Sequence, residues 1–368
     1  MSVVIFKKAS YDYEILKPVI FDLLACLDDN LINKNTHVLI KPNLLLPALP
    51  ESGITTHPLV VKAVAEYVIS KGALVVISDS PASGTFRKIN IQGGYKDAFK
   101  DLNVQFKEFS ASVKKDIGDP FGVIDIAKEV LEADVVINLA KLKTHSQMLL
   151  TLGIKNIFGC IVGFKKPDWH YRAGIDREMF AQLLVQIYRA VAPSVTIVDG
   201  ILAVEGQGPG KRGTPRKLDI IVGSKNAVSA DMAICSMLGM DHDKVPTLRA
   251  AKKLGLADDE IYIKGDFNMI NDFVFPEMSN LVFGPKYLHK IIRKHLLYRP
   301  VVQNSICKLC GECWKYCPAK AISFNVKKIY FDYNKCIRCY CCLEICPHGA
   351  ICSKEPLSGR VLRKFLNI

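Results

Sequence analysis

Short runs of apolar, often β-branched residues alternate with amphipathic stretches along residues 1–285. The apolar runs predict strands, because β-branched side chains favour extended backbone. The stretches between them carry apolar residues at intervals of three and four, which predicts helices. The expected strands are residues 3–6, 37–40, 74–77, 134–138, 195–198 and 218–222, and the expected helices are residues 11–27, 58–70, 176–191 and 226–239.

Continuous apolar strands separated by helices are typical of a parallel sheet that is buried on both faces. We therefore expect a Rossmann-like α/β domain with a mainly parallel sheet, helices on both faces, and one or two lobes. Polar residues follow several expected strands, where ligands of such sheets bind. These residues are Lys41 with Asn43, Asp79, Lys141 and Asp199.

After residue 300 the alternation of apolar strands and amphipathic helices gives way to a cysteine-rich segment. Two copies of C-x-x-C-x-x-C-x-x-x-C-P follow each other at an offset of 29 residues. This run resembles the two-cluster bacterial ferredoxins over residues 303–353, in which the fourth cysteine of each copy ligates the other cluster. The resemblance implies one [4Fe–4S] cluster on Cys307, Cys310, Cys313 and Cys346, and a second on Cys336, Cys339, Cys342 and Cys317, with Cys341 and Cys352 outside the pattern.

Three other interpretations of the cysteines remain open. Zinc is disfavoured, because structural zinc sites use paired C-x-x-C knuckles rather than a triple followed by Cys-Pro. Disulfides are disfavoured, because clustered thiols without a secretory signal indicate metal binding in a reducing compartment. Clusters with a purely structural role are compatible with the same spacing.

Charge divides the chain unevenly. Of the net +13, residues 1–285 carry 33 Lys/Arg against 32 Asp/Glu, whereas residues 286–368 carry 16 against 4. Part of this excess offsets the negative charge of the clusters and their thiolates. The remainder favours an acidic redox partner protein. Nucleic acid is a weaker interpretation, because no nucleic-acid-binding module accompanies the charge.

Length and hydropathy set the expected organisation. We expect an α/β domain over residues 1–285, a basic helical linker over 286–302, the ferredoxin domain over 303–353 and a basic C-terminal tail over 354–368. The linker is interpreted as a packed connector with a solvated basic face, rather than a membrane-surface helix. No apolar run approaches the ~20 residues of a membrane helix, and the start of the chain predicts a strand. A cytoplasmic location is therefore expected.

Several motifs of the large domain together resemble one family. They include Lys141-Leu142-Lys143-Thr144-His145, the stretch of residues 153–159 with Lys155 and Asn156, and residues 165–170. With residues 41–43, 55–58 and 198–209, these motifs resemble the DUF362 family, a domain of unknown function often joined to a ferredoxin module. The resemblance covers residues 1–245 and implies a Rossmann-like fold without an established reaction.

The chemistry of the large domain is predicted from its lysines, histidines and acids. The candidate catalytic residues are Lys141, Lys143, His145, Lys155, Asp199 and His57. Crowded or desolvated lysines act as bases or Schiff-base nucleophiles, or hold anionic groups as point charges. The alternatives are hydrogen-bonded structural histidines and salt-bridged surface lysines. Together with His170, the histidines His57 and His145 could converge on one site.

A second set of residues is expected to bind a cofactor or substrate: Lys41, Asn43, Asp79, Asn156, Gly206, Gly208 and Lys211. The last three belong to a glycine-rich basic stretch, residues 206–213, whose backbone N–H groups can cradle an anion. A mobile loop over the site is the alternative. The stretch is neither Walker A nor G-x-G-x-x-G, so nucleotide binding is weakly indicated.

Three functions fit these features. The preferred hypothesis is an oxidoreductase in which the clusters pass electrons to or from a small anionic substrate or cofactor in the α/β domain. The second is non-redox lysine/histidine chemistry, such as an isomerisation, with structural clusters. The third is a dedicated electron carrier without its own active site. A further metal or a flavin in residues 1–285 is left open.

Overall fold

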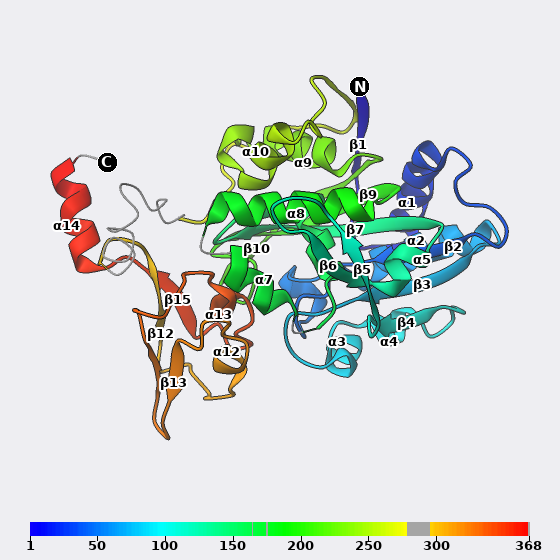
Figure 1. Cartoon of the computed structure of the whole chain (residues 1–368). Helices are drawn as coiled ribbons and strands as arrows, with labels where there is room; N and C mark the ends of the chain where they lie inside the picture. The colour runs from blue at the N-terminus through cyan, green and yellow to red at the C-terminus, as the bar shows by residue number, and fades with distance from the viewer. Residues whose placement is uncertain (164, 174–175, 278–294, 367–368) are drawn as a thin grey trace.

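A large α/β unit is followed by a smaller unit of short strands and helices in the computed structural model (Figure 1). The structure describes residues 1–163, 165–173, 176–277 and 295–366. The small unit lies beside the part of the large unit that contains α7, Lys165–Ala173.

One nine-stranded sheet organises the large unit. Its order is β11-β1-β10-β9-β7-β2-β3-β4, and β8 pairs with β7. The strands are β1 Ser2–Lys8, β2 His37–Lys41, β3 Leu74–Asp79, β4 Gln105–Glu108, β7 Val135–His145, β8 Leu149–Thr151, β9 Val195–Gly206, β10 Gly213–Ser224 and β11 Ile261–Gly265.

The five strands from β9 to β4 in this order are parallel, whereas β10 is antiparallel to both β9 and β1. The predicted α/β class with a mostly parallel sheet is thus confirmed. Strands β7 and β9 run several residues further than expected, and Lys141 pairs in register with Asp199 between them. These two residues therefore lie within strands rather than after them. The hairpin of β5 Ser112–Asp116 and β6 Val123–Ala127 was not predicted.

Helices cover both faces of the sheet. The expected amphipathic helices form and begin at side-chain caps: Asp12 accepts from the Glu14 N–H, and Asp176 accepts from the N–H groups of Glu178 and Met179. The helices are α1 Tyr13–Asp28, α2 Pro58–Ser70, α3 Phe86–Gln92, α4 Tyr95–Ala98, α5 Lys128–Glu132, α6 Gly153–Asn156, α7 Lys165–Ala173, α8 Arg177–Val191, α9 Ala227–Met237 and α10 Pro246–Lys253, with 3-10 turns at Pro50–Ser52, Ile157–Cys160 and His242–Lys244.

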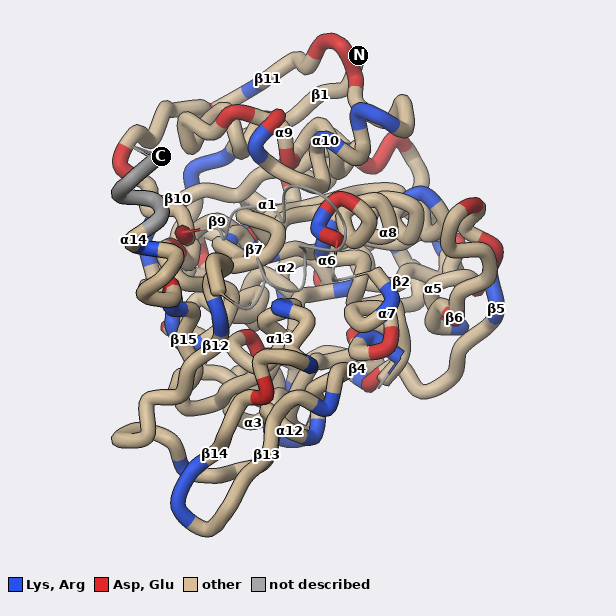
Figure 2. Tube along the Cα trace, turned by 60° about the vertical axis from the view of Figure 1, so that its left-hand side comes forward, with Lys and Arg blue, Asp and Glu red and all other residues tan. Residues whose placement is uncertain are grey.

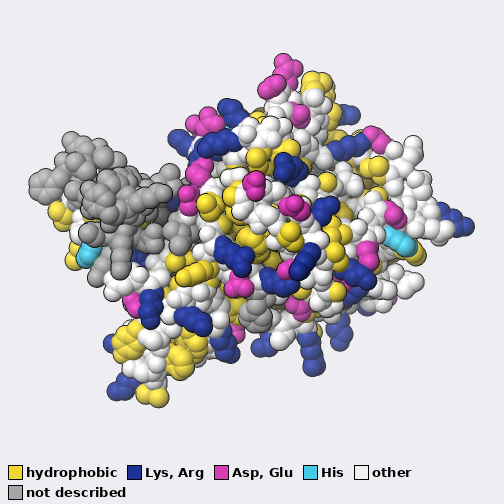
Figure 3. All heavy atoms as spheres, viewed as in Figure 1, with side chains coloured by type: hydrophobic (Ala, Val, Ile, Leu, Met, Phe, Trp, Pro, Cys, Tyr) yellow, Lys and Arg dark blue, Asp and Glu magenta, His cyan; other side chains and the backbone are white. Residues whose placement is uncertain are grey.

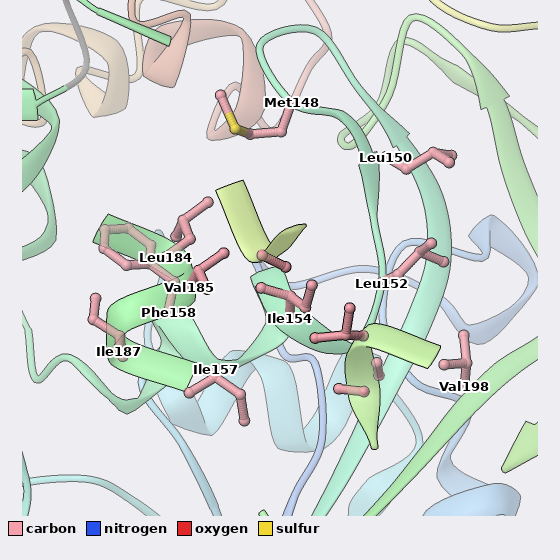
Figure 4. Packing of buried hydrophobic residues seen from close by; sticks show 14 of the residues in the cluster. Met148, Leu150, Leu152, Ile154, Ile157, Phe158, Leu184, Val185, Ile187 and Val198 are labelled. Carbon is pink, nitrogen blue, oxygen red and sulfur yellow. The ribbon is translucent and has the colours of Figure 1, made fainter. Parts of the chain in front are cut away.

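Two hydrophobic clusters form the core of the large unit. One includes Leu16 and Ile20 of α1 and Val64 of α2; the other includes residues of α6, α8 and α9. Figure 4 shows Ile154 and Phe158 among side chains from α8 and from the β7–β8 region. The short helix α6 is thereby held firmly, and it carries Lys155 and Asn156.

The small unit contains two antiparallel strand pairs, β12 with β15 and β13 with β14. Its elements are β12 Arg299–Val302, α12 Glu312–Lys315, β13 Ile322–Phe324, β14 Ile329–Phe331, α13 Cys341–Glu344, β15 Ile351–Lys354 and α14 Leu357–Leu366. The basic tail is therefore helical. Most of the predicted linker helix falls in residues 278–294, outside the described residues, and the domain boundaries stay predictions. Among the described helices, none combines the length and apolarity needed to cross a membrane.

Candidate functional site

A pocket with a cavity volume of about 90 Å³ lies where the large and small units meet, and we call it the interdomain pocket. Lysines dominate its polar wall, and both units contribute residues. The large unit supplies Lys41, Asn43, Asp79, Lys143, Lys155, Asn156, Lys166 and His170, and the small unit supplies Tyr316, Cys341, Glu344 and Ile345.

Lys41 and Asp79 form a buried ion pair in the pocket wall. They lie at the ends of the neighbouring parallel strands β2 and β3, and their Nζ and Oδ1 atoms are 2.8 Å apart. The N–H of Leu44 donates to Asp79 Oδ2 at 2.8 Å. Gly159 packs so closely that a Cβ there would lie 2.2 Å from Asp79 Oδ1. The pair is thus fixed in place and contributes no net charge.

Lys143 of β7 reaches the same pocket but pairs with no carboxylate among the described residues. Its Nζ atom donates to Asn43 Oδ1 at 2.8 Å and to the carbonyl oxygen of Ile54 at 2.6 Å. Burial, together with the nearby Lys155 ammonium, holds the pKa of Lys143 well below its ordinary value. Asn43 in turn donates to Asn156 Oδ1 at 2.9 Å, so the acceptor of Lys143 is itself held in position.

Lys155 is carried by α6, whose start is capped by Asp231 of α9. The N–H groups of Gly153 and Ile154 donate to the two oxygens of this carboxylate at 2.7 and 3.1 Å. Burial raises the pKa of Asp231 to about 7. Lys155 itself has no hydrogen-bond or ion-pair partner within the described part of the chain, and burial lowers its pKa. Its ammonium is therefore available to a ligand of the pocket.

Lys166 of α7 adds a further cation. Its Nζ atom donates to the carbonyl oxygen of Ser80, directly after β3. Burial lowers the pKa of Lys166 to about 8. The lysine therefore lies close to its titration point at neutral pH.

Glu344 of the small unit contacts His145 of the large unit. Glu344 Oε1 lies 2.8 Å from His145 Nε2. His145 Nδ1 accepts the N–H groups of Gln147 and Met148, each at 3.1 Å, so the neutral ring carries its proton on Nε2, towards the carboxylate. Burial lowers the pKa of His145 to about 4. Burial alone would raise the pKa of Glu344, but the His145 ring and the Lys155 ammonium outweigh it and lower the pKa.

A second polar cluster surrounds Asp199 of β9. Lys141 Nζ donates to Asp199 Oδ2 at 2.7 Å and to the Tyr11 hydroxyl at 2.8 Å, while that hydroxyl donates to Asp199 Oδ1 at 2.9 Å. The His57 backbone N–H donates to Asp199 Oδ2 at 3.0 Å, and its ring stacks on Tyr11. Burial lowers the pKa of His57 to about 4. The charges of Lys141 and Asp199 are thus paired within the cluster.

The structure therefore divides the predicted catalytic residues. Lys143 and Lys155 line the interdomain pocket and His145 contacts its Glu344, whereas Lys141, Asp199 and His57 form the separate cluster. The alternative of salt-bridged surface lysines is wrong for Lys141 and Lys143, which are fully buried. Of the three histidines, His170 lines the pocket and His145 contacts Glu344, whereas His57 lies with Lys141 and Asp199.

The glycine-rich stretch lies against the protein rather than forming an open anion cradle. The N–H of Gly208 donates to Thr144 Oγ1 at 3.1 Å, and Gly206 donates to the carbonyl oxygen of Val274. Lys211 packs against Gly349 of the small unit. A Cβ at Gly208 would lie 2.5 Å from the Thr144 carbonyl oxygen, so glycine is needed for close packing. Of this stretch, Pro209 lines the pocket.

Sequence reasoning did not assign Lys166, Asp231 or Glu344 to a site. Lys166 was visible within the family motif of residues 165–170, but nothing in its local pattern indicated burial. Glu344 is the single acid between Asp332 and Glu355 in a strongly basic region. This isolated acid could have been singled out from the sequence as a candidate site residue. Asp231 lies in an apolar helix 78 residues from its partner Gly153, and no spacing rule predicts such a contact.

The eight patterned cysteines form two groups in the small unit. Cys307, Cys310, Cys313 and Cys346 line one cavity. Cys317, Cys336, Cys339 and Cys342 line another, which Cys341 also borders. All of them are free thiols. Each cavity thus gathers four patterned thiols, the number that a [4Fe–4S] cluster needs, in the crosswise sets that the resemblance implied; the assignment of clusters to them stays a prediction.

The comparisons with known proteins agree with this architecture. A model of the domain of unknown function DUF362 matches residues 38–236, and a model of the 4Fe-4S dicluster domain matches residues 299–347. The thylakoid-associated protein sll1697 of Synechocystis sp. is 37% identical over 257 residues, which are 69% of this chain and 80% of that protein.

Two further likenesses are more limited. Pyruvate synthase subunit PorD of Thermotoga maritima is 38% identical over 55 residues, which are 14% of this chain and 54% of the subunit. The lactate racemase apoprotein from Thermoanaerobacterium thermosaccharolyticum is similar at 14% identity and a TM-score of 0.42, over 64% of this chain and 56% of that chain. The chain thus belongs to the DUF362 family and carries a ferredoxin-type 4Fe-4S domain at its C-terminal end.

Proposed function

We propose that this protein is a ferredoxin-coupled oxidoreductase that passes electrons to or from a small anionic substrate or cofactor in the interdomain pocket. The observation that carries the proposal is the position of Cys341. This residue lines both the interdomain pocket and the cavity of Cys317, Cys336, Cys339 and Cys342. The candidate substrate site and the candidate cluster site thus share one wall.

Two [4Fe–4S] clusters are proposed, one on Cys307, Cys310, Cys313 and Cys346, and one on Cys317, Cys336, Cys339 and Cys342. When bound, such clusters supply one-electron transfer at low potential. The free thiols of the chain suit a reducing compartment, and we propose the cytoplasm.

The charges of the pocket favour an anion. The Lys41–Asp79 pair cancels within itself, and Lys155 and Lys166 then outnumber the remaining carboxylate, Glu344, even with Lys143 neutral. Lys155 is the cation best placed to hold a carboxylate or phosphate, because no described residue occupies its ammonium. Exclusion of water strengthens such an attraction relative to bulk solvent. The cavity volume of about 90 Å³ suits a small anion.

The surface of the small unit suits an acidic redox partner protein. Lys and Arg lie near β14 and α12 (Figure 2), and basic side chains surround exposed apolar ones in this part of Figure 3. Phe324 and Val326 are exposed beside Lys327 and Lys328. Positive patches steer acidic proteins into encounter. The likeness of this unit to a pyruvate synthase subunit also supports a protein partner.

Lys143 favours a second candidate function, which is non-redox lysine chemistry on the same anion. A buried amine with a lowered pKa can act as a base or nucleophile at neutral pH. In that case the clusters would have a structural role, stabilising the wall of the pocket, and would not transfer electrons.

Anaerobic purification of the full chain, followed by iron and sulfide analysis, tests the cluster proposal, for which about eight irons are expected. Dithionite-reduced protein is then mixed with single small oxo acids such as pyruvate, and reoxidation is followed by visible absorbance. The oxidoreductase proposal requires reoxidation that saturates with the acid and is lost in Lys155→Met, whereas Lys115→Met, an exposed control, retains it. Turnover of the acid by protein without redox-active clusters would instead support the second candidate.

A further inference from the structure

Lys143 differs from the other buried lysines in what surrounds its amino group. Lys41 and Lys141 each face a carboxylate at 2.7 to 2.8 Å. In the described part of the chain, Lys143 has two partners, the Asn43 side-chain oxygen and the Ile54 carbonyl oxygen, and both are neutral. It is 1% exposed, and it comes from a strand whose every residue is buried.

The number of acceptors matches a neutral amine. An ammonium group has three N–H donors, and a buried ammonium needs an acceptor for each and a counter-charge. A neutral amine has two N–H donors and one lone pair. The two hydrogen bonds of Lys143 use both donors and leave the lone pair unoccupied. Burial and the neighbouring Lys155 cation both disfavour protonation of the Lys143 amine.

We propose that Lys143 is a nucleophile that condenses with the carbonyl carbon of a small 2-oxo acid bound in the interdomain pocket, with Lys155 holding the carboxylate. This inference rests on the proposed anion site and adds the substrate class. The pocket gives both groups access to one ligand, since Lys143 and Lys155 line it together. A three-carbon oxo acid has six heavy atoms, which suits a cavity of about 90 Å³.

The condensation needs no oxidant or reductant. The lone pair of Nζ forms a bond to the carbonyl carbon while the carbonyl oxygen takes a proton, giving a carbinolamine. The carbon–oxygen bond then breaks, the hydroxyl leaves as water with a second proton, and a carbon–nitrogen double bond forms. The two N–H protons of the amine balance the two protons gained by the oxygen. Lys166, whose pKa is lowered to about 8, lines the same pocket and can relay them.

Position explains why Lys143, rather than Lys155 or Lys166, is assigned this role. Two hydrogen bonds fix the direction of its nitrogen, and the first acceptor, Asn43, is tied to Asn156. A nucleophile held in one orientation loses less freedom on reaching the reactive geometry. Among the residues that the structure describes, Lys155 has no partner that fixes its head group, and Lys166 has the Ser80 carbonyl oxygen alone.

Reductive trapping tests the inference. The full-length holoprotein is incubated anaerobically with pyruvate and sodium cyanoborohydride, and the adduct is located by peptide mass mapping. We expect one saturable adduct per chain, on Lys143. Lys143→Arg should lower the yield at least ten-fold, while Lys115→Arg, an exposed control, should leave it unchanged.

The mapping on wild-type protein remains decisive even if the arginine variant fails to fold. No adduct, or adducts confined to Lys155, Lys166 or surface lysines, would overturn the inference. Trapping requires no electron transfer, so the two proposals fail separately. An adduct on Lys143 without pyruvate-dependent reoxidation supports the inference and counts against the oxidoreductase. Pyruvate-dependent reoxidation without an adduct on Lys143 supports the oxidoreductase and overturns the inference.

Discussion

His145 Nε2 lies 2.8 Å from Glu344 Oε1, and this contact joins β7 of the large unit to α13 of the small unit. The side chains are 0% and 8% exposed, so water cannot replace either partner. Glu344 also lines the interdomain pocket. The same residue thus binds the two units together and closes the candidate site.

Loss of the Glu344 carboxylate should weaken the whole assembly. Glu344→Ala removes the carboxylate beside His145 Nε2 and the favourable charge that it presents to the Lys155 ammonium, and we expect a loss of roughly 1–3 kcal/mol in the free energy of unfolding. Equilibrium denaturation measures it. Glu312→Ala is a matched control, because Glu312 also contacts the other unit, through Ser83 at 3.0 Å, but is half-buried. Equal effects of the two substitutions would contradict the role given to Glu344.

His170 should make stability depend on acid pH. Burial lowers the pKa of His170 to about 3, against an ordinary value of 6.5. Between pH 3 and pH 6.5, His170 is protonated in the unfolded chain but stays neutral in the folded protein. The contribution of the neutral ring is fully present above pH 6.5 and is lost as pH falls towards 3.

His170→Phe tests this dependence and preserves the ring contacts with Phe158 and Phe180. Unfolding free energies are compared at pH 7.5 and 5.5 for both proteins. The wild type should lose about 1 kcal/mol more than the variant, at 1.36 kcal/mol per pH unit below 6.5. His37→Gln, at an exposed position, should leave the wild-type dependence intact. Identical pH slopes for wild type and His170→Phe would contradict a neutral buried ring.

Asp231 should position Lys155 through the start of α6. Asp231→Ala removes the acceptor of two backbone N–H groups, for which we expect a loss of about 1–2 kcal/mol of stability. We also expect weaker binding of small carboxylates, measured by calorimetry, because Lys155 is displaced. Ser229→Ala lies on the same helix and contacts Asp258 instead, so it should not alter binding. Unchanged carboxylate affinity in Asp231→Ala would rule out the positioning role.

The two neighbouring thiols Cys341 and Cys342 should behave differently. Cys342 belongs to the repeated pattern, and Cys342→Ala should remove about four irons from the anaerobically purified protein. Cys341 borders the same cavity but falls outside the pattern, so Cys341→Ala should retain about eight irons. Iron analysis checks both. Loss of iron from Cys341→Ala with retention in Cys342→Ala would reverse the assignment of ligands.

Local patterns predicted much of the fold because they depend on neighbouring residues. Periodic apolar positions and capping residues such as Asp12 and Asp176 act within one helix, and the strands of the large unit alternate with those helices. The length of β7 was underestimated because Lys141 and Lys143 look polar, while in the sheet both side chains are buried. Hydrogen bonding to distant partners overrides their preference for solvent.

By itself, the sequence determined the α/β class, the DUF362 motifs and the repeated cysteine pattern, because each resides in the spacing of nearby residues. Only the tertiary structure decided which of these residues meet. The register of β7 against β9 placed Lys141 opposite Asp199 and Lys143 opposite Val204, and packing of the small unit brought Glu344 and Cys341 to the pocket. The physical reason is that a contact between residues as distant in sequence as His145 and Glu344 depends on how whole units pack, whereas a local periodicity reflects only neighbouring residues.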